Sequence, residues 1–231
     1  IALLRTFADQ AAIAIENVRL FNETKEALEQ QTASAEVLTA ISRSTADAQP
    51  VFDSICASLQ RLLPGADLAI SAAGDAGRLY WRAGSGELVA LMQPLFPRPA
   101  PTQQGLITGQ PSNWPDIVHG PGAPESLRAA FRSLGRNASM LSAAMTSGGQ
   151  VVGTLSALRT DMRPFSDKES RLLKVFADQA VIAIQNVRLF NDTQEALARQ
   201  TATSDVLQVI SESPTDVQPV FEAIVKAGVR L

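Results

Sequence analysis

The chain has 231 residues and a formal net charge of −3, with 45% hydrophobic and 19% charged residues. This composition excludes a disordered chain, and the absence of basic runs gives no reason to expect a nucleic-acid partner. The single cysteine, Cys56, excludes an internal disulfide framework, and no cluster of Cys and His residues predicts a metal site.

No apolar run reaches the roughly 18 residues that a membrane-spanning helix needs, so no membrane partner is expected. The sequence begins IALLRTF, without an initiator Met or a signal-peptide pattern. Because these residues already follow a helical pattern, we expect the chain to be an excerpt of a longer cytoplasmic protein.

Residues 3–44 are predicted to form the first long helix. Its first half is apolar almost all round, so it needs cover on two sides, from a sheet or from partner helices. Its second half, from Asn22 to Glu36, keeps only a thin apolar seam. Such a seam does not stabilise a lone helix in water, so we expect a partner helix of the same kind.

The middle of the chain combines short helices and short strands. A helix begins at Asp47 or Gln49, with Pro50 in its first turn, and ends at Pro64-Gly65. Further short helices are predicted at 87–95 and 124–134, strands at 67–73, 77–83, 138–146 and 150–159, and an extended piece at 112–117. The last two strands form a hairpin around a Ser-Gly-Gly turn. The sum is one compact α+β domain of about 120 residues.

The second long helix is predicted from Phe165 to Ser213. Ser166, followed three residues later by Glu169, is typical of a capping-box start. Apolar residues then recur at three- and four-residue steps, which predicts a buried seam along the helix.

The two long helices belong to a sequence repeat. Phe7 aligns with Phe176 and Phe52 with Phe221, both at an offset of 169 residues. Residues 1–62 and 170–231 share 36 identities in 62 positions. A period this long predicts that each repeat holds a whole domain and its connecting helix.

Four segments together resemble a GAF domain of bacterial sensor proteins: PFSDKESRLLKVFADQAVIAIQNVRLF, the hairpin ASMLSAAM–GGQVVGTLSALR, the helix start QPVFDSI, and Trp114-Pro115-Asp116-Ile117. The repeats are similar to those of tandem-GAF sensor histidine kinases and nucleotide cyclases. The resemblance implies a GAF-like antiparallel sheet of five or six strands. One face would be covered by the first and last helices, and the other by loops and short helices that close over a ligand cavity.

The resemblance also implies a division of the chain. Residues 1–48 would be the last helix of a preceding GAF unit and its connecting signalling helix, and residues 49–190 the complete GAF domain. Residues 191–213 would be the next connecting helix, and residues 214–231 the first helix of a following unit. The long helices are expected to form coiled coils.

We expect a sensory module that passes a conformational bias, induced by a ligand or a neighbour, along dimeric helices to a distant kinase or cyclase. It would not be an enzyme, because no nucleophile–base pair is found. The alternative is a dimerisation and spacer module that binds no ligand. The sequence identifies no cofactor; an unidentified small molecule, a second copy of the chain, adjacent GAF units and a downstream effector domain are the expected partners.

A ligand cavity needs apolar walls with a few polar points, and the domain offers both. The candidate lining residues are Ser71, Tyr80, Trp81, Met92, Phe96, Thr102, Thr108, Trp114, Asp116, Phe131 and Ser142. The alternative is that they fill a second core beneath the loops.

The dimer is expected to be parallel and to use the four-three seam of the long helices, where small residues allow close approach and Val–Phe packs tightly. The seam residues are Ala11, Ala14, Val18, Phe21 and Leu28 in the first helix, and Ala180, Ala183, Val187, Phe190 and Leu197 in the second. A rigid spacer would show the same pattern as a relay.

Two reactive residue types favour ordinary roles. Cys56 has no neighbouring His or Tyr, so a buried small apolar residue is favoured over a chromophore linkage. The lone His119 has only Asp116 near it, which favours a solvated loop residue over a metal or haem ligand.

Overall fold

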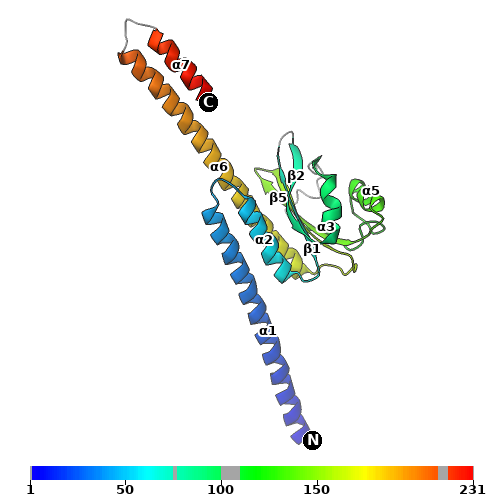
Figure 1. The fold of residues 1–231 in the computed structure, drawn as a ribbon. Helices are drawn as coiled ribbons and strands as arrows, with labels where there is room; N and C mark the ends of the chain where they lie inside the picture. Colours follow the sequence, from blue (N-terminus) through cyan, green and yellow to red (C-terminus); the bar gives the residue numbers. More distant parts are fainter. Residues whose placement is uncertain (1, 75–76, 100–109, 213–217, 231) are drawn as a thin grey trace.

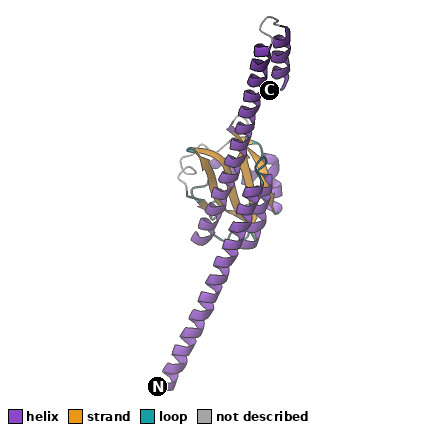
Figure 2. Cartoon of the chain, turned by 90° about the vertical axis from the view of Figure 1, so that its left-hand side faces the viewer, coloured by secondary structure: helices purple, strands orange, loops and turns teal. Residues whose placement is uncertain are grey.

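The computed structural model describes residues 2–74, 77–99, 110–212 and 218–230 (Figure 1). A sheet domain lies beside two long helices, α1 (Ala2–Arg43) and α6 (Asp167–Glu212). The two helices leave the domain in opposite directions, so the ends of the chain lie far apart (Figures 1 and 2). None of the described helices has the length and apolar character to cross a membrane.

The described sheet has six antiparallel strands in the order β3-β2-β1-β6-β5-β4. Their bounds are β1 Asp67–Ala73, β2 Arg78–Ser85, β3 Arg98–Pro99, β4 Ser112–Trp114, β5 Ser139–Ser147 and β6 Gln150–Arg159. The predicted α+β class and the predicted number of strands are therefore confirmed. The two-residue strand β3 was not predicted, because it lies in a proline cluster that carries no strand pattern.

The hairpin of β5 and β6 has the tight turn that its sequence predicts. Ser147 pairs with Gln150, which leaves Gly148 and Gly149 as the two loop residues. Both have positive φ angles, of 56° and 76°. A two-residue turn of this kind requires positive φ at both positions, which glycine adopts without steric cost.

One face of the sheet packs on a layer of three helices: α2 (Gln49–Leu62), the second half of α1 and the first half of α6. Strand side chains alternate between faces, so Leu68, Ile70 and Ala72 of β1 point into this core. Phe52, Ile55, Leu59, Val37, Leu173, Phe176 and Ala180 meet them from the helices.

The helices in this layer have defined directions. Glu26 pairs with Lys168, and Ser34 accepts a hydrogen bond of 2.5 Å from Gln179, so α1 and α6 run side by side in the same direction. α2 runs back along α1, because its end carries Arg61, which pairs with Glu36.

The opposite face of the sheet is covered by short elements: α3 (Glu87–Met92), the 3₁₀ turn η2 (Gln93–Leu95) and α5 (Glu125–Ser133). They enclose a second, smaller core. Its fully or nearly fully buried members include Val89, Met92, Trp114, Ile117, Leu127, Phe131, Met140 and Leu158.

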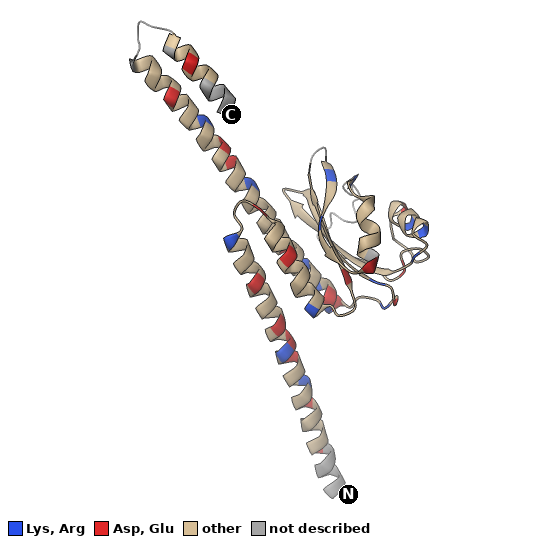
Figure 3. Cartoon of the chain, in the orientation of Figure 1, with Lys and Arg blue, Asp and Glu red and all other residues tan. Residues whose placement is uncertain are grey.

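Outside the sheet domain, both long helices, α1 and α6, are exposed to solvent. Residues 9–28 of α1 are exposed on every side, and so is α6 beyond residue 187, save for a few half-buried positions. Positive and negative side chains are interspersed along both helices (Figure 3). A last helix, α7 (Gln218–Arg230), folds back against the end of α6 (Figure 1).

Candidate functional site

A cavity lies on the face of the sheet that carries α3 and α5. It is lined by Ala69, Ser71, Met92, Phe96, Arg98, Met140, Thr154, Ser156 and Leu158. The strands supply this lining by alternation: in β1, Leu68 and Ile70 face the long helices, whereas Ala69 and Ser71 face the cavity. The same two-residue rule brings alternate residues of β6 to the cavity.

The floor of the cavity carries a strip of hydroxyl groups. Ser71 and Thr154, which are cross-strand partners on β1 and β6, share a hydrogen bond of 2.8 Å. Ser156 shares one of 2.9 Å with Ser142 of β5. Because a hydroxyl is both donor and acceptor, each pair keeps hydrogen-bonding capacity beyond the bond it shares.

Arg98 brings a positive charge to the cavity. Its guanidinium carbon lies 4.9 Å from the centre of the Phe96 ring. Its Nε atom is buried and has no hydrogen-bond partner in the described part of the chain. Burial lowers the pKa of Arg98, since it disfavours the charged form.

The free space in this cavity is small. Its volume is about 10 Å³, which is room for about one water molecule. A larger ligand therefore requires lining side chains to move. Met92 and Met140 are part of the wall, and methionine is the apolar side chain that adapts its shape most readily.

Several residues predicted from the sequence lie at this site. Ser71, Met92 and Phe96 line the cavity. Trp81 lies one layer behind, with its ring centroid 5.7 Å from that of Phe96 in an edge-to-face arrangement. Thr102 and Thr108, also predicted, lie outside the described residues.

The remaining predicted residues lie elsewhere. Trp114 and Phe131 are packed in the second core, and Ser142 reaches the cavity only through its hydrogen bond to Ser156. The ring of Tyr80 lies 6.0 Å from the guanidinium of Arg82 and does not line the cavity.

Asp116 shapes a loop and not the cavity. Its Oδ1 atom accepts hydrogen bonds from the backbone N–H of His119, at 2.7 Å, and from the side chain of Asn137, at 2.9 Å. These bonds, that of His119 first, lower the pKa of Asp116 to about 2. His119 itself is exposed on the surface, with 75% of its side chain accessible.

The sequence-based prediction does not contain Arg98, Thr154 or Ser156, nor the apolar lining residues Ala69, Met140 and Leu158. The sequence did contain a pattern that could have identified the lining residues of β6. Once the β5–β6 hairpin is placed, residues 154, 156 and 158 must share one face. Arg98 had no such signal, because its strand is two residues long.

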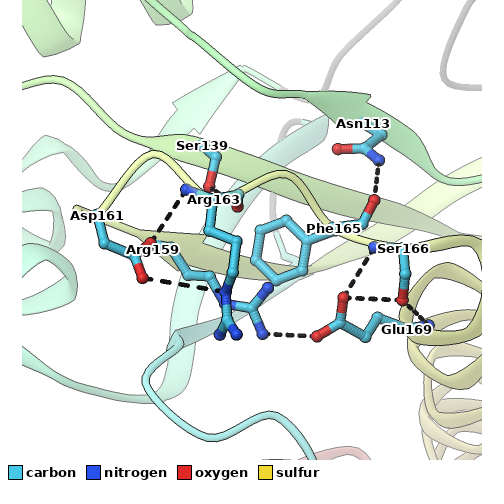
Figure 4. Close-up of polar contacts among 8 residues, drawn as sticks. All are labelled: Asn113, Ser139, Arg159, Asp161, Arg163, Phe165, Ser166 and Glu169. Carbon is cyan, nitrogen blue, oxygen red and sulfur yellow. Dashed lines mark hydrogen bonds and ion pairs between the residues drawn. The ribbon is translucent and has the colours of Figure 1, made fainter.

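A second polar cluster joins the sheet to the first turn of α6 (Figure 4). Arg159, the last residue of β6, has a side chain that is 1% exposed, and its Nη2 lies 2.6 Å from Oε1 of Glu169. Its guanidinium carbon also lies 4.2 Å from the centre of the Phe165 ring. Burial raises the pKa of Glu169, but hydrogen bonds from Arg159 and Ser166 outweigh burial, so the net pKa is below its ordinary value.

The connection between β6 and α6 is held at further points (Figure 4). Asn113 of β4 donates a hydrogen bond of 2.8 Å to the carbonyl of Phe165, and Ser139 of β5 donates one of 2.8 Å to the carbonyl of Arg163. The backbone N–H of Ser166 donates to Glu169 at 2.8 Å, and its hydroxyl accepts from the Glu169 N–H, so the predicted capping box is present. Three strands thus fix the start of α6.

Cys56 is buried in the core under the long helices and has 7% of its surface exposed. Burial, assisted by Asp53, raises the pKa of its thiol to about 12. Among the residues that the structure describes, no group of His, Cys, Asp and Glu side chains is arranged to hold a metal ion.

The predicted dimer residues fall into two groups. Ala180 and Ala183 are buried against the sheet of their own chain, at 0% and 1% exposure, so they offer no surface to a partner helix. Val187 is half-buried at the edge of this contact. The remaining residues are exposed: Ala11, Ala14, Val18, Phe21, Leu28, Phe190 and Leu197.

A different apolar stripe lies on the outer face of α6. Val175, Ile182 and Leu189 follow one another at seven-residue steps and are 49%, 43% and 64% exposed. With 3.6 residues per turn, they lie on a different face of the helix from Phe176, Ala180 and Ala183. Two of them have identical counterparts in α1, where Ile13 and Leu20 are 61% and 48% exposed.

The sequence model of the GAF domain family matches residues 47–184. No curated protein matches the chain. Among solved structures, a GAF domain of a phosphoenolpyruvate-protein phosphotransferase from Coxiella burnetii is 14% identical, with a TM-score of 0.56, over 72% of this chain and 98% of its own. A domain of a two-component sensor histidine kinase protein from Sinorhizobium meliloti 1021 is 17% identical, with a TM-score of 0.50, over 62% and 94%. The phycoerythrobilin-bound GAF domain of a cyanobacterial phytochrome is 16% identical, with a TM-score of 0.54, over 69% and 96%.

Proposed function

Because this chain belongs to the GAF domain family, we propose that it is a sensory and regulatory module. A ligand, or a neighbouring domain, favours one packing of the sheet against α6. Paired long helices pass this bias to an effector domain of the same protein, a kinase or a cyclase. The module itself carries out no reaction.

The observation that carries this proposal is the continuity of α6. Its first half is buried beneath the sheet, with Leu173, Phe176 and Ala180 in the core, and its second half runs on beyond the domain. No break separates the two halves between Asp167 and Glu212. A shift of the helix against the sheet must therefore move the part outside the domain.

The start of α6 is attached to the strands that form the ligand face. Arg159 of β6, Ser139 of β5 and Asn113 of β4 all hold the segment that leads into the helix. β5 and β6 also supply lining residues of the cavity, including Met140 and Thr154. These shared strands give a ligand in the cavity a mechanical connection to the helix.

The same pair of helices, a long helix and a shorter one that folds back on it, occurs at both ends of the chain, which supports a tandem arrangement. α2 folds back against α1, and α7, which repeats the α2 sequence, folds back against α6. Ala11 and Ala14 of α1 correspond to Ala180 and Ala183, which lie beneath the sheet. We therefore assign residues 1–48 to the end of a preceding unit, whose sheet would cover Ala11 and Ala14, and residues 214–231 to the start of a following one.

A second copy of this chain is the proposed partner of the outer stripe Val175, Ile182 and Leu189. Seven-residue spacing keeps such a stripe against a parallel partner helix. The identical residues of α1, Ile13 and Leu20, would continue the contact along the neighbouring rod. Beyond the sheet, the predicted residues Phe190 and Leu197 are exposed on a neighbouring face of α6, and Val18, Phe21 and Leu28 of α1 are exposed as well, so a partner helix can contact them there.

Similar structures support a sensory role, since one belongs to a sensor histidine kinase protein and another holds a bound bilin. One observation favours the alternative, a dimerisation and spacer module without a ligand. The cavity of about 10 Å³ is nearly filled by the protein's own side chains.

Mass spectrometry of the purified protein separates the two proposals. The chain is denatured, and the small molecules that it releases are compared with those released by a variant whose cavity is blocked, Ala69→Phe. A molecule that is released by the wild type and absent from the variant supports the sensor. Release of nothing by either protein, together with an unchanged dimer, supports the spacer.

A further inference from the structure

We propose that the cavity takes an anionic ligand, a small molecule with a carboxylate or phosphate group on an apolar body, and that Arg98 recognises its charge. This inference rests on the proposed sensory function and adds the chemical class of the ligand. It is carried by the guanidinium of Arg98, whose buried Nε has no hydrogen-bond partner among the described residues, at the wall of a cavity with hydroxyl groups on its floor.

Arg98, which is half-buried, differs from the fully buried Arg159, although Nε of each lacks a hydrogen-bond partner among the described residues. Arg159 lies against the carboxylate of Glu169, which offsets the cost of removing its charge from water. Arg98 has no such carboxylate among the described residues, and burial lowers its pKa. Its contact with the Phe96 ring compensates only in part, since cation–π contacts are weaker than a buried ion pair.

A desolvated cation without a counter-ion destabilises a fold, and a bound anion would remove this cost. The guanidinium has five N–H donors in a planar fork that matches a carboxylate or phosphate. Nε of Arg98 is a free donor in the described structure, and it belongs to a side chain that lines the cavity. An anion at this point would accept from Nε and neutralise the charge.

The remaining lining suits the rest of such a ligand. Ser71, Thr154 and Ser156 place hydroxyl donors on the floor. Met92, Phe96 and Met140, with Ala69 and Leu158, supply apolar walls. No carboxylate is among the described lining residues, so these residues offer a cationic ligand the like charge of Arg98 and no counter-ion.

The test uses matched probes, because the natural ligand is unidentified. Benzoate is compared with benzamide, and phenyl phosphate with phenol, by ligand-detected NMR and by tryptophan fluorescence in a Trp114→Phe background, which reports on Trp81 next to Phe96. At least one anion should bind the wild type at least about tenfold more tightly than its neutral partner. Arg98→Gln should remove this preference, and Arg98→Lys should keep part of it.

Arg82→Gln is the matched control, because Arg82 lies on the neighbouring strand, is exposed and does not line the cavity. It should bind the anions as the wild type does. Equal anion binding by Arg98→Gln and the wild type, or failure of all four probes to bind, would overturn the proposal. The proposed sensory function is tested separately, by the molecules that the denatured protein releases. If a neutral molecule is released while no anion binds, the anionic ligand is refuted and the sensory function stands.

Thermal unfolding without ligand gives a second, independent measurement. If Arg98 binds a ligand and does not stabilise the fold, Arg98→Met removes a half-buried charge that has no carboxylate partner among the described residues, and it should raise Tm by about 2–4 °C. A fall in Tm larger than that of Arg82→Met would show that Arg98 serves the fold and would overturn its role in recognition.

Discussion

Nη2 of Arg159 lies 2.6 Å from Oε1 of Glu169, and this ion pair joins the end of strand β6 to the first turn of helix α6. The two residues are ten positions apart, and the connection between them also packs Phe165 on the guanidinium at 4.2 Å. The start of α6 is therefore bound to the sheet by charge, by an aromatic contact and by hydrogen bonds at once. This junction is where the proposed relay can be tested most directly.

Glu169→Gln should destabilise the domain strongly, because it leaves the Arg159 charge buried without its counter-ion. We expect a loss of about 3 kcal/mol in the free energy of unfolding, measured by urea denaturation at pH 7. The combination of Arg159→Met with Glu169→Gln should cost less than Glu169→Gln alone. The surface pair of Glu195 and Arg199 on the same helix is the control, and Glu195→Gln should change stability by less than about 0.5 kcal/mol. Similar losses for Glu169→Gln and Glu195→Gln would mean that the junction does not hold α6.

Asp116 should make a pH-dependent contribution to stability. Its pKa of about 2 in the folded chain is below its ordinary value of 3.8. The stabilisation is therefore complete above pH 3.8 and is lost as the pH falls toward 2. Asp116→Ala should lower Tm at pH 7, and the gap from the wild type should narrow between about pH 4 and pH 2. A gap that stays constant over this range, relative to the control Asp205→Ala on the exposed part of α6, would contradict the assigned hydrogen bonds.

The thiol of Cys56 should be unreactive in the folded protein. Its pKa of about 12 and its burial leave almost no thiolate at pH 8. Reaction with Ellman's reagent should be at least about 100-fold slower than in denaturant. Ser204→Cys in a Cys56→Ala background, which places a thiol on the exposed part of α6, should react at the unfolded rate. Rapid reaction of Cys56 in the native chain would contradict its burial and would favour a chromophore linkage at this residue.

Disulfide cross-linking tests the proposed dimer and the face of α6 through which it would form. In a Cys56→Ala background, Leu189→Cys on the outer stripe should form an interchain disulfide on mild oxidation. Arg188→Cys, one residue away on another face, should not. Val187→Cys reports on the seam that the sequence predicts, and it should cross-link less than Leu189→Cys because Val187 is half-buried against its own domain. A chain that stays monomeric at all concentrations would refute the paired rods.

Local sequence signals predicted most of the fold. The turn glycines Gly148 and Gly149, the capping box of Ser166 and Glu169, and the three-and-four spacing of the long helices all act over a few residues. Each specifies its element without knowledge of the rest of the chain. The helix bounds, the hairpin and the α+β class were accordingly predictable.

Long-range contacts were not predictable by the same means. The apolar seam of α6 is plain in the sequence, but the pattern does not say whether a sheet or another helix covers it. Ala180 and Ala183 were assigned to a partner helix and lie instead beneath the sheet. Arg98 and Arg159 look like surface residues in the sequence, because the charge of a side chain reveals nothing of the phenyl ring or carboxylate that folding brings to it.

The side-by-side arrangement of α1 and α6 determines how the domain would bear tension. A pull on the two ends of the chain draws α1 one way and α6 the other, since the helices run in the same direction and leave from opposite ends. Their packed overlap is then loaded in shear along its whole length. In an extended array of such units, the contacts between the two helices, such as those of Glu26 with Lys168 and of Ser34 with Gln179, would therefore carry the load.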